Sequence, residues 1–285
     1  LVVGRVVGLR PHLRWYDAKP LFGRCVLVTR PREQAAELVD RLTALGSDPI
    51  EAPLIRIAPA DDLGPLRDAA AAPDAFEWIV FTSVNAVDAF MKALLEGDRD
   101  VRMLKGPRLC AVGAGTAEKL AEYGIKVDLV PGEFRAEAVV AALTAAGPVD
   151  GVRVLLPRAD IGREVVGDQL RQAGAVVTDV VAYRTILDDT PRESDPDVYK
   201  LLLEGRIDVV TFASPSAVRG FVKIYGAEPA ADLLKNTVVG VIGPVTADVA
   251  RQLSIPVTIQ PSTYTIAALV DGIVAHYATK ATKTV

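Results

Sequence analysis

Short apolar runs alternate with amphipathic segments along most of the chain. Cys25–Thr29, Trp78–Phe81 and Leu109–Val112 are apolar and rich in β-branched or aromatic residues, which predicts buried parallel strands. Between such runs, apolar residues recur at helical spacing, as in Glu33–Leu45 and Asn85–Leu95. Strands that alternate with helices predict an α/β fold, with a parallel sheet covered by helices on both faces.

The longest β-branched run is Val176–Leu187, which carries one tyrosine, Tyr183. It predicts an extended strand that leads from one half of the chain into the other. Its counterpart in the first half is the extended segment Ile50–Ala58. The first half is further predicted to have helices at Asp61–Ala72, from Gly115 to Tyr123 and at Ala136–Ala145, and a strand at Val127–Val130. The second half is predicted to repeat these elements, with a first apolar run at Val152–Arg158 and a last helix at Ile266–Tyr277.

The same motifs occur twice, in the same order. FTSVNAV at 81–87 is matched by FASPSAV at 212–218, VGAGTA at 112–117 by IGPVTA at 242–247, and Pro131 by Pro261. The spacing between partners is nearly constant. Three pairs in the same order at nearly the same spacing are difficult to explain by coincidence. The sequence therefore predicts an internal duplication with two similar doubly wound α/β units.

Composition and charge narrow the class of protein. The chain has 285 residues, 50% of them hydrophobic, which is enough for two cores. A formal net charge of −4 without a long basic run argues against a nucleic-acid or membrane-surface partner. Cys25 and Cys110 lie in apolar runs, which indicates buried thiols rather than a disulfide or metal site. Without a recognisable signal peptide or bilayer-spanning run, we expect a cytoplasmic protein.

Candidate binding residues gather where the predicted strands end. Ligands of open parallel sheets bind beyond these carboxyl ends, near helix N-termini with free N–H groups. The stretches there offer hydroxyls, glycines and arginines, a set of donors that suits an anionic ligand. The candidate binding residues are Arg30, Ser83, Asn85, Gly113, Thr116, Arg158, Arg163, Ser214, Ser216, Gly243 and Thr246.

Each of these residues also has a structural interpretation. Ser83, Ser214 and Ser216 are typical helix N-caps, and the glycines are typical of tight turns. Capping alone does not require hydroxyls at matching places in both halves, so the repetition favours ligand contact. Tyr183 is either a packing residue or a functional one. A nicotinamide site is not expected, because Gly113-Ala114-Gly115 lacks the third glycine and the acidic residue of that motif.

Taken together, the motifs resemble those of uroporphyrinogen-III synthase. The resemblance covers residues 24–278 and rests on VLVTRP, FTSVNAV, AVGAGTA, FRAEAVV, VAYRT, FASPSAV and VIGPVTA. Residues 1–23 also resemble the C-terminal end of uroporphyrinogen-III C-methyltransferase, which some bacteria fuse ahead of the synthase. The catalytic body of that enzyme is not represented, so no methylation is predicted.

The resemblance implies two flavodoxin-like domains and an enzyme without cofactor or metal. Its substrate is hydroxymethylbilane, a linear tetrapyrrole that loses the hydroxyl of ring A and closes with ring D inverted to give uroporphyrinogen III. Tyr183 matches the tyrosine that assists this loss. Some relatives carry arginine where this chain has Asn85, so their charged contact is not expected here. The residues that match substrate contacts are Ser83, Thr116, Ser214 and Thr246.

The two extended segments allow two domain arrangements. Either each half of the chain folds alone, or the segments lie side by side as a two-strand connection. Partly from the resemblance, we favour the second, with domain 1 at residues 24–55 and 186–278 and domain 2 at residues 56–185. Residues 1–23 are expected to be a tail or linker, and residues 279–285 a polar tail.

We also expect a monomer that receives its substrate from hydroxymethylbilane synthase. A different class of protein remains an alternative, namely a non-enzymatic bilobed binder or sensor of a small polyanionic ligand. Such a protein would not need a tyrosine between its units and would release its ligand unaltered.

Overall fold

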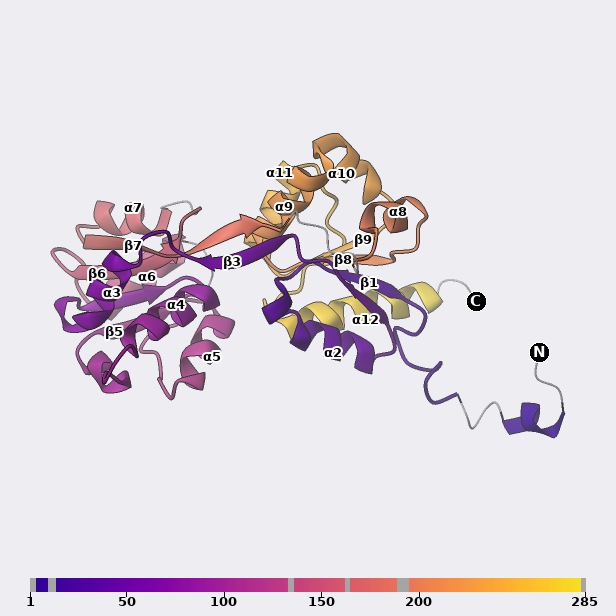
Figure 1. Cartoon of the computed structure of the whole chain (residues 1–285), viewed down its shortest axis with the longest axis horizontal. Helices are drawn as coiled ribbons and strands as arrows, with labels where there is room; N and C mark the ends of the chain where they lie inside the picture. The colour runs from indigo at the N-terminus through magenta and orange to yellow at the C-terminus, as the bar shows by residue number, and fades with distance from the viewer. Residues whose placement is uncertain (1–3, 10–13, 133–135, 162–164, 189–194, 283–285) are drawn as a thin grey trace. The chain divides into compact units, whose positions relative to one another are not determined.

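The computed structural model describes residues 4–9, 14–132, 136–161, 165–188 and 195–282 (Figure 1). Its contacts divide the chain into two compact units. Unit 1 holds Leu1–Arg56 and Leu187–Val285, and unit 2 holds Ile57–Ile186. Unit 1 is therefore built from two separate stretches of chain, with unit 2 inserted between them.

Unit 1 contains a four-stranded parallel sheet in the order β2-β1-β8-β9. A single parallel bridge from Gly240 to Ile259 extends it beyond β9. Its strands are β1 (Cys25–Val28), β2 (Asp48–Glu51), β8 (Val209–Phe212) and β9 (Val238–Val241). Its helices are η1 (Arg5–Leu9), η2 (Arg32–Gln34), α2 (Ala36–Ala44), α8 (Val198–Leu203), α9 (Pro215–Tyr225), α10 (Ala227–Leu233), α11 (Pro244–Gln252) and α12 (Ile266–Thr282), the η elements being 3₁₀ helices.

Alternation along β1 explains why helices cover both faces of this sheet. Val26 and Val28 point to one face, where they pack in a core that includes Leu38 of α2 and Leu269 of α12. Leu27 points to the other face and packs in the core with α8, α9, α10 and α11. All three residues are fully buried, as expected for a parallel strand with side chains in alternating directions.

Unit 2 has a five-stranded sheet in the order β3-β7-β6-β4-β5. The pairings of β7 with β6, β6 with β4 and β4 with β5 are parallel. Its strands are β3 (Ile55–Pro59), β4 (Trp78–Phe81), β5 (Arg108–Ala111), β6 (Arg153–Ala159) and β7 (Val176–Leu187), and its helices are α3 (Gly64–Ala71), η3 (Pro73–Ala75), α4 (Val84–Leu94), η4 (Val101–Lys105), α5 (Ala114–Glu122), α6 (Ala136–Ala146) and α7 (Val165–Gln172). The limits of the units fall within β3 and β7, which are neighbours in this sheet.

The predicted duplication is confirmed by the strand order. The order β7-β6-β4-β5 of unit 2 repeats the order β2-β1-β8-β9 of unit 1, and each sheet has a bridge beyond its last strand. Phe81 packs edge to face on Phe90, and Phe212 packs in the same way on Phe221. The same flavodoxin-like order thus occurs twice. The two units differ in chain order, because β6, the equivalent of β1, comes after β4 and β5 in unit 2.

Several predicted elements differ from the observed ones at their ends. The extended segment Ile50–Ala58 is interrupted, because Pro53 offers no N–H to a sheet and β2 and β3 lie in different sheets. The strand predicted at Val127–Val130 is reduced to one bridge between Leu129 and Cys110. Helix α12 continues past Tyr277 to Thr282, since no glycine or proline follows to end it.

The boundary expected for the N-terminal tail is wrong at its end. Leu21 is fully buried in the core of unit 1 with Val26 and Leu42, and its N–H donates to the carbonyl of Leu45. No sequence pattern indicated this, because a single leucine between Pro20 and Phe22 shows no periodicity.

Among the described residues, none of the helices combines the length and the apolar character that a membrane span requires.

Candidate functional site

The predicted site residues of unit 2 lie around the carboxyl ends of β6, β4 and β5. From β6 the chain passes to β7 on one side, whereas β4 lies on its other side. This is the point in a doubly wound sheet where a crevice forms and ligands bind. The residues placed here are Ser83, Asn85, Gly113, Thr116, Arg158 and Tyr183.

Tyr183 lies on β7 next to an irregularity in the sheet. The register between β6 and β7 shifts between Arg158 and Ala159, and Ala159 then pairs with Tyr183. A bulge of this kind changes the direction in which a side chain points. The tyrosine side chain is 9% exposed, and burial raises the pKa of its phenol. The group therefore stays protonated at neutral pH and can donate a hydrogen bond.

Ser83 connects this tyrosine to the first turn of α4. Its Oγ lies 3.1 Å from the Tyr183 hydroxyl oxygen. The same Oγ caps α4 by accepting the N–H of Ala86 at 3.1 Å. Asn85, the second residue of α4, also hydrogen-bonds to Tyr183, and both bonds lower the pKa of the phenol against the larger effect of burial. The structure thus brings together three residues that the sequence predicted separately.

Asp160 is a neighbour of Tyr183 that was not predicted from the sequence. Its Oδ1 accepts the N–H of Thr185 at 3.0 Å, and its own N–H donates to the carbonyl of Tyr183. These two bonds connect the residue after β6 to β7 on both sides of Arg184, next to the tyrosine. The negative charge of Asp160 is a further cause of the raised pKa of Tyr183.

The other described site residues of unit 2 each have a structural role in the fold. Gly113 precedes α5 with a φ of 103°, a conformation that favours glycine. Thr116 is buried in the first turn of α5 and donates to the carbonyl of Val112 at 3.3 Å. Arg158 is paired with Asp179, Nε to Oδ1 at 3.5 Å. Arg163 lies outside the described residues.

The site residues of unit 1 form a second set at the carboxyl ends of β1, β8 and β9. Ser214 caps α9 by accepting the N–H of Ala217 at 3.2 Å, with the same backbone conformation as Ser83. Ser216 follows in the first turn of α9. Gly243 precedes α11 in an extended conformation, and Thr246 is buried in the first turn of that helix.

Arg30 differs from the other residues of this second set. It lies two residues after the end of β1 and is mostly buried, and burial lowers the pKa of its guanidinium group. Its buried Nε has no hydrogen-bond partner among the described residues. A desolvated guanidinium with an unused donor favours a negatively charged ligand.

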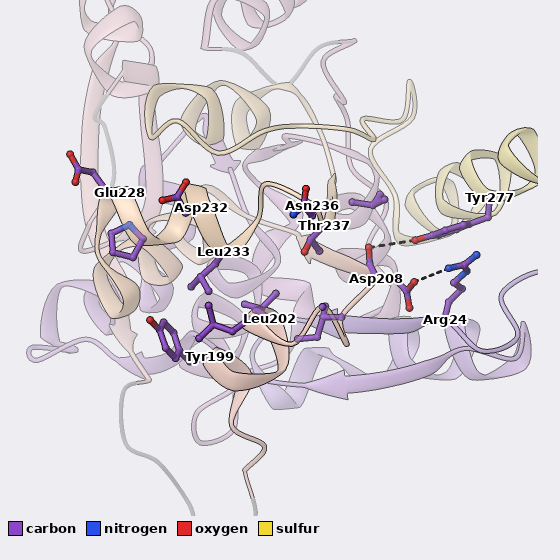
Figure 2. Close-up of a pocket in the computed structure, with 15 residues that line it drawn as sticks. Arg24, Tyr199, Leu202, Asp208, Glu228, Asp232, Leu233, Asn236, Thr237 and Tyr277 are labelled. Carbon is purple, nitrogen blue, oxygen red and sulfur yellow. Dashed lines mark hydrogen bonds and ion pairs between the residues drawn. The ribbon is translucent and has the colours of Figure 1, made fainter.

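A pocket of about 760 Å³ in unit 1 lies away from these residues (Figure 2). It opens at the amino ends of the strands, where Arg24 precedes β1 and Asp208 precedes β8. Figure 2 shows Arg24 paired with Asp208, at 2.8 Å, and the Tyr277 hydroxyl bonded to the Asp208 carbonyl, at 3.4 Å. None of the predicted site residues that the structure describes lines this pocket. It therefore does not belong to the predicted site.

Comparison with known proteins identifies relatives along nearly the whole chain. A family model described as uroporphyrinogen-III synthase HemD matches residues 36–271. A uroporphyrinogen-III synthase of Synechococcus elongatus is 30% identical over 90% of this chain and 96% of its own length. A putative uroporphyrinogen-III synthase of Methanothermobacter thermautotrophicus is 32% identical over 86% of this chain and 96% of its own length.

A solved structure resembles the fold. The crystal structure of a mutant uroporphyrinogen III synthase from the bacterium Thermus thermophilus superimposes with a TM-score of 0.65, covering 90% of this chain and 99% of that one at 19% identity. A uroporphyrinogen-III C-methyltransferase of Bacillus subtilis also matches 49% of this chain, but only 28% of its own length, at 29% identity.

Proposed function

The chain belongs to the uroporphyrinogen-III synthase family, and from this premise we propose that the hydroxyl of Tyr183 assists the first chemical step of the reaction. Enzymes of this kind are cyclising hydro-lyases of tetrapyrrole biosynthesis, and the non-enzymatic binder is not favoured. The substrate is a tetrapyrrole, so the reaction starts with the loss of a hydroxyl group from its linear form.

Loss of that hydroxyl requires a proton or a strong hydrogen bond. Hydroxide is a poor leaving group, and a donor near the departing oxygen lets it leave as water while the pyrrole nitrogen supplies electrons to the carbon. A phenol whose pKa lies above its ordinary value of about 10 stays protonated at neutral pH and can fill this role.

The observation that carries this proposal is the position of the Tyr183 hydroxyl. It lies near the carboxyl ends of the unit 2 strands, 3.1 Å from the hydroxyl oxygen that caps α4. Asp160 is bonded to the backbone beside it, and its Oδ1 acts there as a hydrogen-bond acceptor. Tyr183 is therefore the donor that we assign among these neighbours.

The test is the substitution Tyr183→Phe, which keeps the ring and removes only the hydroxyl. We expect turnover to fall roughly 100-fold, about 2.7 kcal/mol, in a protein that remains folded. Free hydroxymethylbilane closes without ring inversion, so the type I fraction of the product should rise. Freshly made hydroxymethylbilane and chromatographic separation of the type I and type III isomers measure both effects.

Tyr123→Phe is the matched control. Tyr123 belongs to the same unit, and its hydroxyl donates to Oδ1 of Asp88 at 3.2 Å, so this change also removes one hydroxyl from a partly buried tyrosine. Its turnover should stay within about twofold of the parent. Equal turnover and isomer ratios in both variants would assign the donor role to substrate or solvent.

We also propose that carboxylates of the substrate bind at the strand ends of both units. Arg30 supports this, because its buried Nε lacks a partner among the described residues and carboxylates accept well from guanidinium groups. Helix N-termini at Gly113 and Gly243 add backbone N–H groups that suit the same anions.

The remaining proposals concern the setting of the enzyme. We propose that it acts as a monomer in the cytoplasm and receives its substrate from hydroxymethylbilane synthase. Residues 1–23 are proposed to derive from the C-terminal end of a methyltransferase, for which the partial match to the Bacillus subtilis enzyme is weak support. For the domains, we propose residues 24–55 with 186–278, to whose core Leu21 also belongs, and residues 56–185.

A further inference from the structure

The Tyr183 oxygen has two polar side-chain neighbours on one helix end. Ser83 lies at the N-cap of α4 and Asn85 in its first turn, and both bond to the phenol. Their common position matters, because a helix N-terminus presents a positive end to any charge that develops nearby. From the sequence, both residues were expected to contact the substrate directly.

The cap bond bears on the direction of the Ser83–Tyr183 bond. A serine hydroxyl has one proton to donate and two lone pairs to accept with. The N–H of Ala86 already occupies one lone pair of Ser83 at 3.1 Å. If Ser83 donates its proton to Tyr183, the tyrosine keeps its own proton for another partner. If Tyr183 donates instead, its proton is taken up by the cap.

We propose that Ser83 and Asn85 are positioning residues, which donate hydrogen bonds to the Tyr183 oxygen and so direct its proton to the leaving group. This inference rests on the function proposed for Tyr183. In the step, the Tyr183 O–H proton passes to the substrate hydroxyl, the C–O bond breaks with its electron pair, and water leaves. The two donors stabilise the phenolate, which recovers a proton when the closing pyrrole ring loses one.

The surroundings of Tyr183 explain why such donors matter. The side chain is 9% exposed and lies near the Asp160 carboxylate, and both conditions disfavour a phenolate. Two donors on the oxygen oppose these effects and make the phenol a stronger acid. Without them, proton transfer from this buried group would be slower.

Ser83→Gly tests the inference with little damage to the helix. Glycine is an acceptable N-cap that costs only a few tenths of a kcal/mol relative to serine, so α4 should still form. We expect kcat to fall about tenfold, with KM within about twofold, because the hydroxyl acts on the reaction rather than on binding. Ser83→Thr keeps the hydroxyl and should restore most of the loss. Asp197→Gly, at the cap of α8 where Asp197 accepts the N–H of Lys200 at 3.0 Å, is the matched cap control and should leave kcat unchanged.

A direct readout of the phenol completes the test. With 3,5-difluorotyrosine at position 183, fluorine NMR can follow the titration of this one group, and Ser83→Gly should raise its pKa. Because the fluorinated phenol is more acidic, it should also restore part of the turnover that Ser83→Gly loses. In the Tyr183→Phe background, Ser83→Gly should cost no further activity.

The outcomes separate the two proposals. A raised KM with unchanged kcat in Ser83→Gly would make Ser83 a substrate contact and overturn the positioning role. An unchanged pKa of the fluorinated phenol would overturn it as well, and would leave Ser83 as a cap. Full turnover in Tyr183→Phe would instead refute the donor role of Tyr183, whatever the titration shows about Ser83.

Discussion

Gly113 and Gly243 stand at equivalent places before helices of the two units, but their backbones differ. Gly113 has a φ of 103°, whereas Gly243 is extended, with a φ of −173°. We expect Gly113→Ala to lower the free energy of unfolding by about 1–2 kcal/mol through backbone strain. Gly243→Ala brings a Cβ within 3.1 Å of the Tyr264 ring, which can shift at a cost below about 1 kcal/mol. Urea unfolding of both variants measures the difference, and equal losses would contradict it.

The thiol of Cys110 makes stability depend on pH in alkaline solution. Burial raises the pKa of this thiol from its ordinary value of 9.0 to about 12. A raised pKa in the folded state means that the stabilisation is complete below pH 9 and is lost as pH rises toward 12. We expect the free energy of unfolding of the parent to fall with pH more steeply than that of Cys110→Ala, by up to about 1.4 kcal/mol per pH unit.

Urea unfolding between about pH 8 and 11 measures that difference in slope. Other groups, including Cys25 and Tyr277, also titrate in this range, but they are common to both proteins and cancel in the comparison. Parallel pH profiles of the two proteins would show that ionisation of the Cys110 thiol does not destabilise the folded state.

At the scale of residues, the sequence predicted which kinds of side chain lie at the strand ends better than which partners they bond to. The hydroxyls Ser83 and Ser214 were identified from the repeat, and both are caps in the structure. The bond from Ser83 to Tyr183 could not be predicted, because it joins residues 100 positions apart in sequence. Asp160 was not predicted for the same reason, because its hydrogen bonds are to Tyr183 and Thr185 of β7, which are distant in sequence.

Among the elements, the segment before β1 is the one whose importance the sequence hid. Leu21 is fully buried, so we expect Leu21→Ala to lower the free energy of unfolding by about 2–4 kcal/mol. Leu203→Ala is the matched control, because that side chain is 63% exposed, and it should cost less than about 1 kcal/mol. Thermal or urea unfolding of the two variants measures this, and similar losses would place Leu21 outside the cooperative core.

The elements that were predicted well are those with a strong local pattern. β7 spans Val176–Leu187 as predicted, because its β-branched residues favour strand over helix along the whole run. The segment predicted as a strand at Val127–Val130 has no such continuous β-branched run, and it forms one bridge, between Leu129 and Cys110. Local patterns thus predicted which segments extend along a sheet better than how many of their residues pair.

For the whole molecule, the insertion of unit 2 makes a specific excision possible. The N–H of Asp188 donates to the carbonyl of Leu54 at 3.0 Å, so the two stretches of unit 1 are already adjacent there. We expect a chain that joins Arg56 to Leu187 through Asn-Gly, without residues 57–186, to fold as unit 1 alone. Its two cores lie within unit 1 and remain complete. A cooperative thermal transition and dispersed amide NMR signals are the expected results, and a chain without either would show that unit 1 requires unit 2.

The same insertion affects how the protein is made. Thr29, next to β1, donates to the carbonyl of Thr211 in β8, and these two residues are 182 positions apart. A ribosome adds about 5–20 residues per second, so β1 waits roughly 10–40 s for its neighbour to be synthesised. Unit 2 is completed within that time, while β1 still has an open, apolar edge. We therefore expect the nascent chain to depend on chaperones that bind near the ribosome, and to be most prone to aggregation just before β8 emerges.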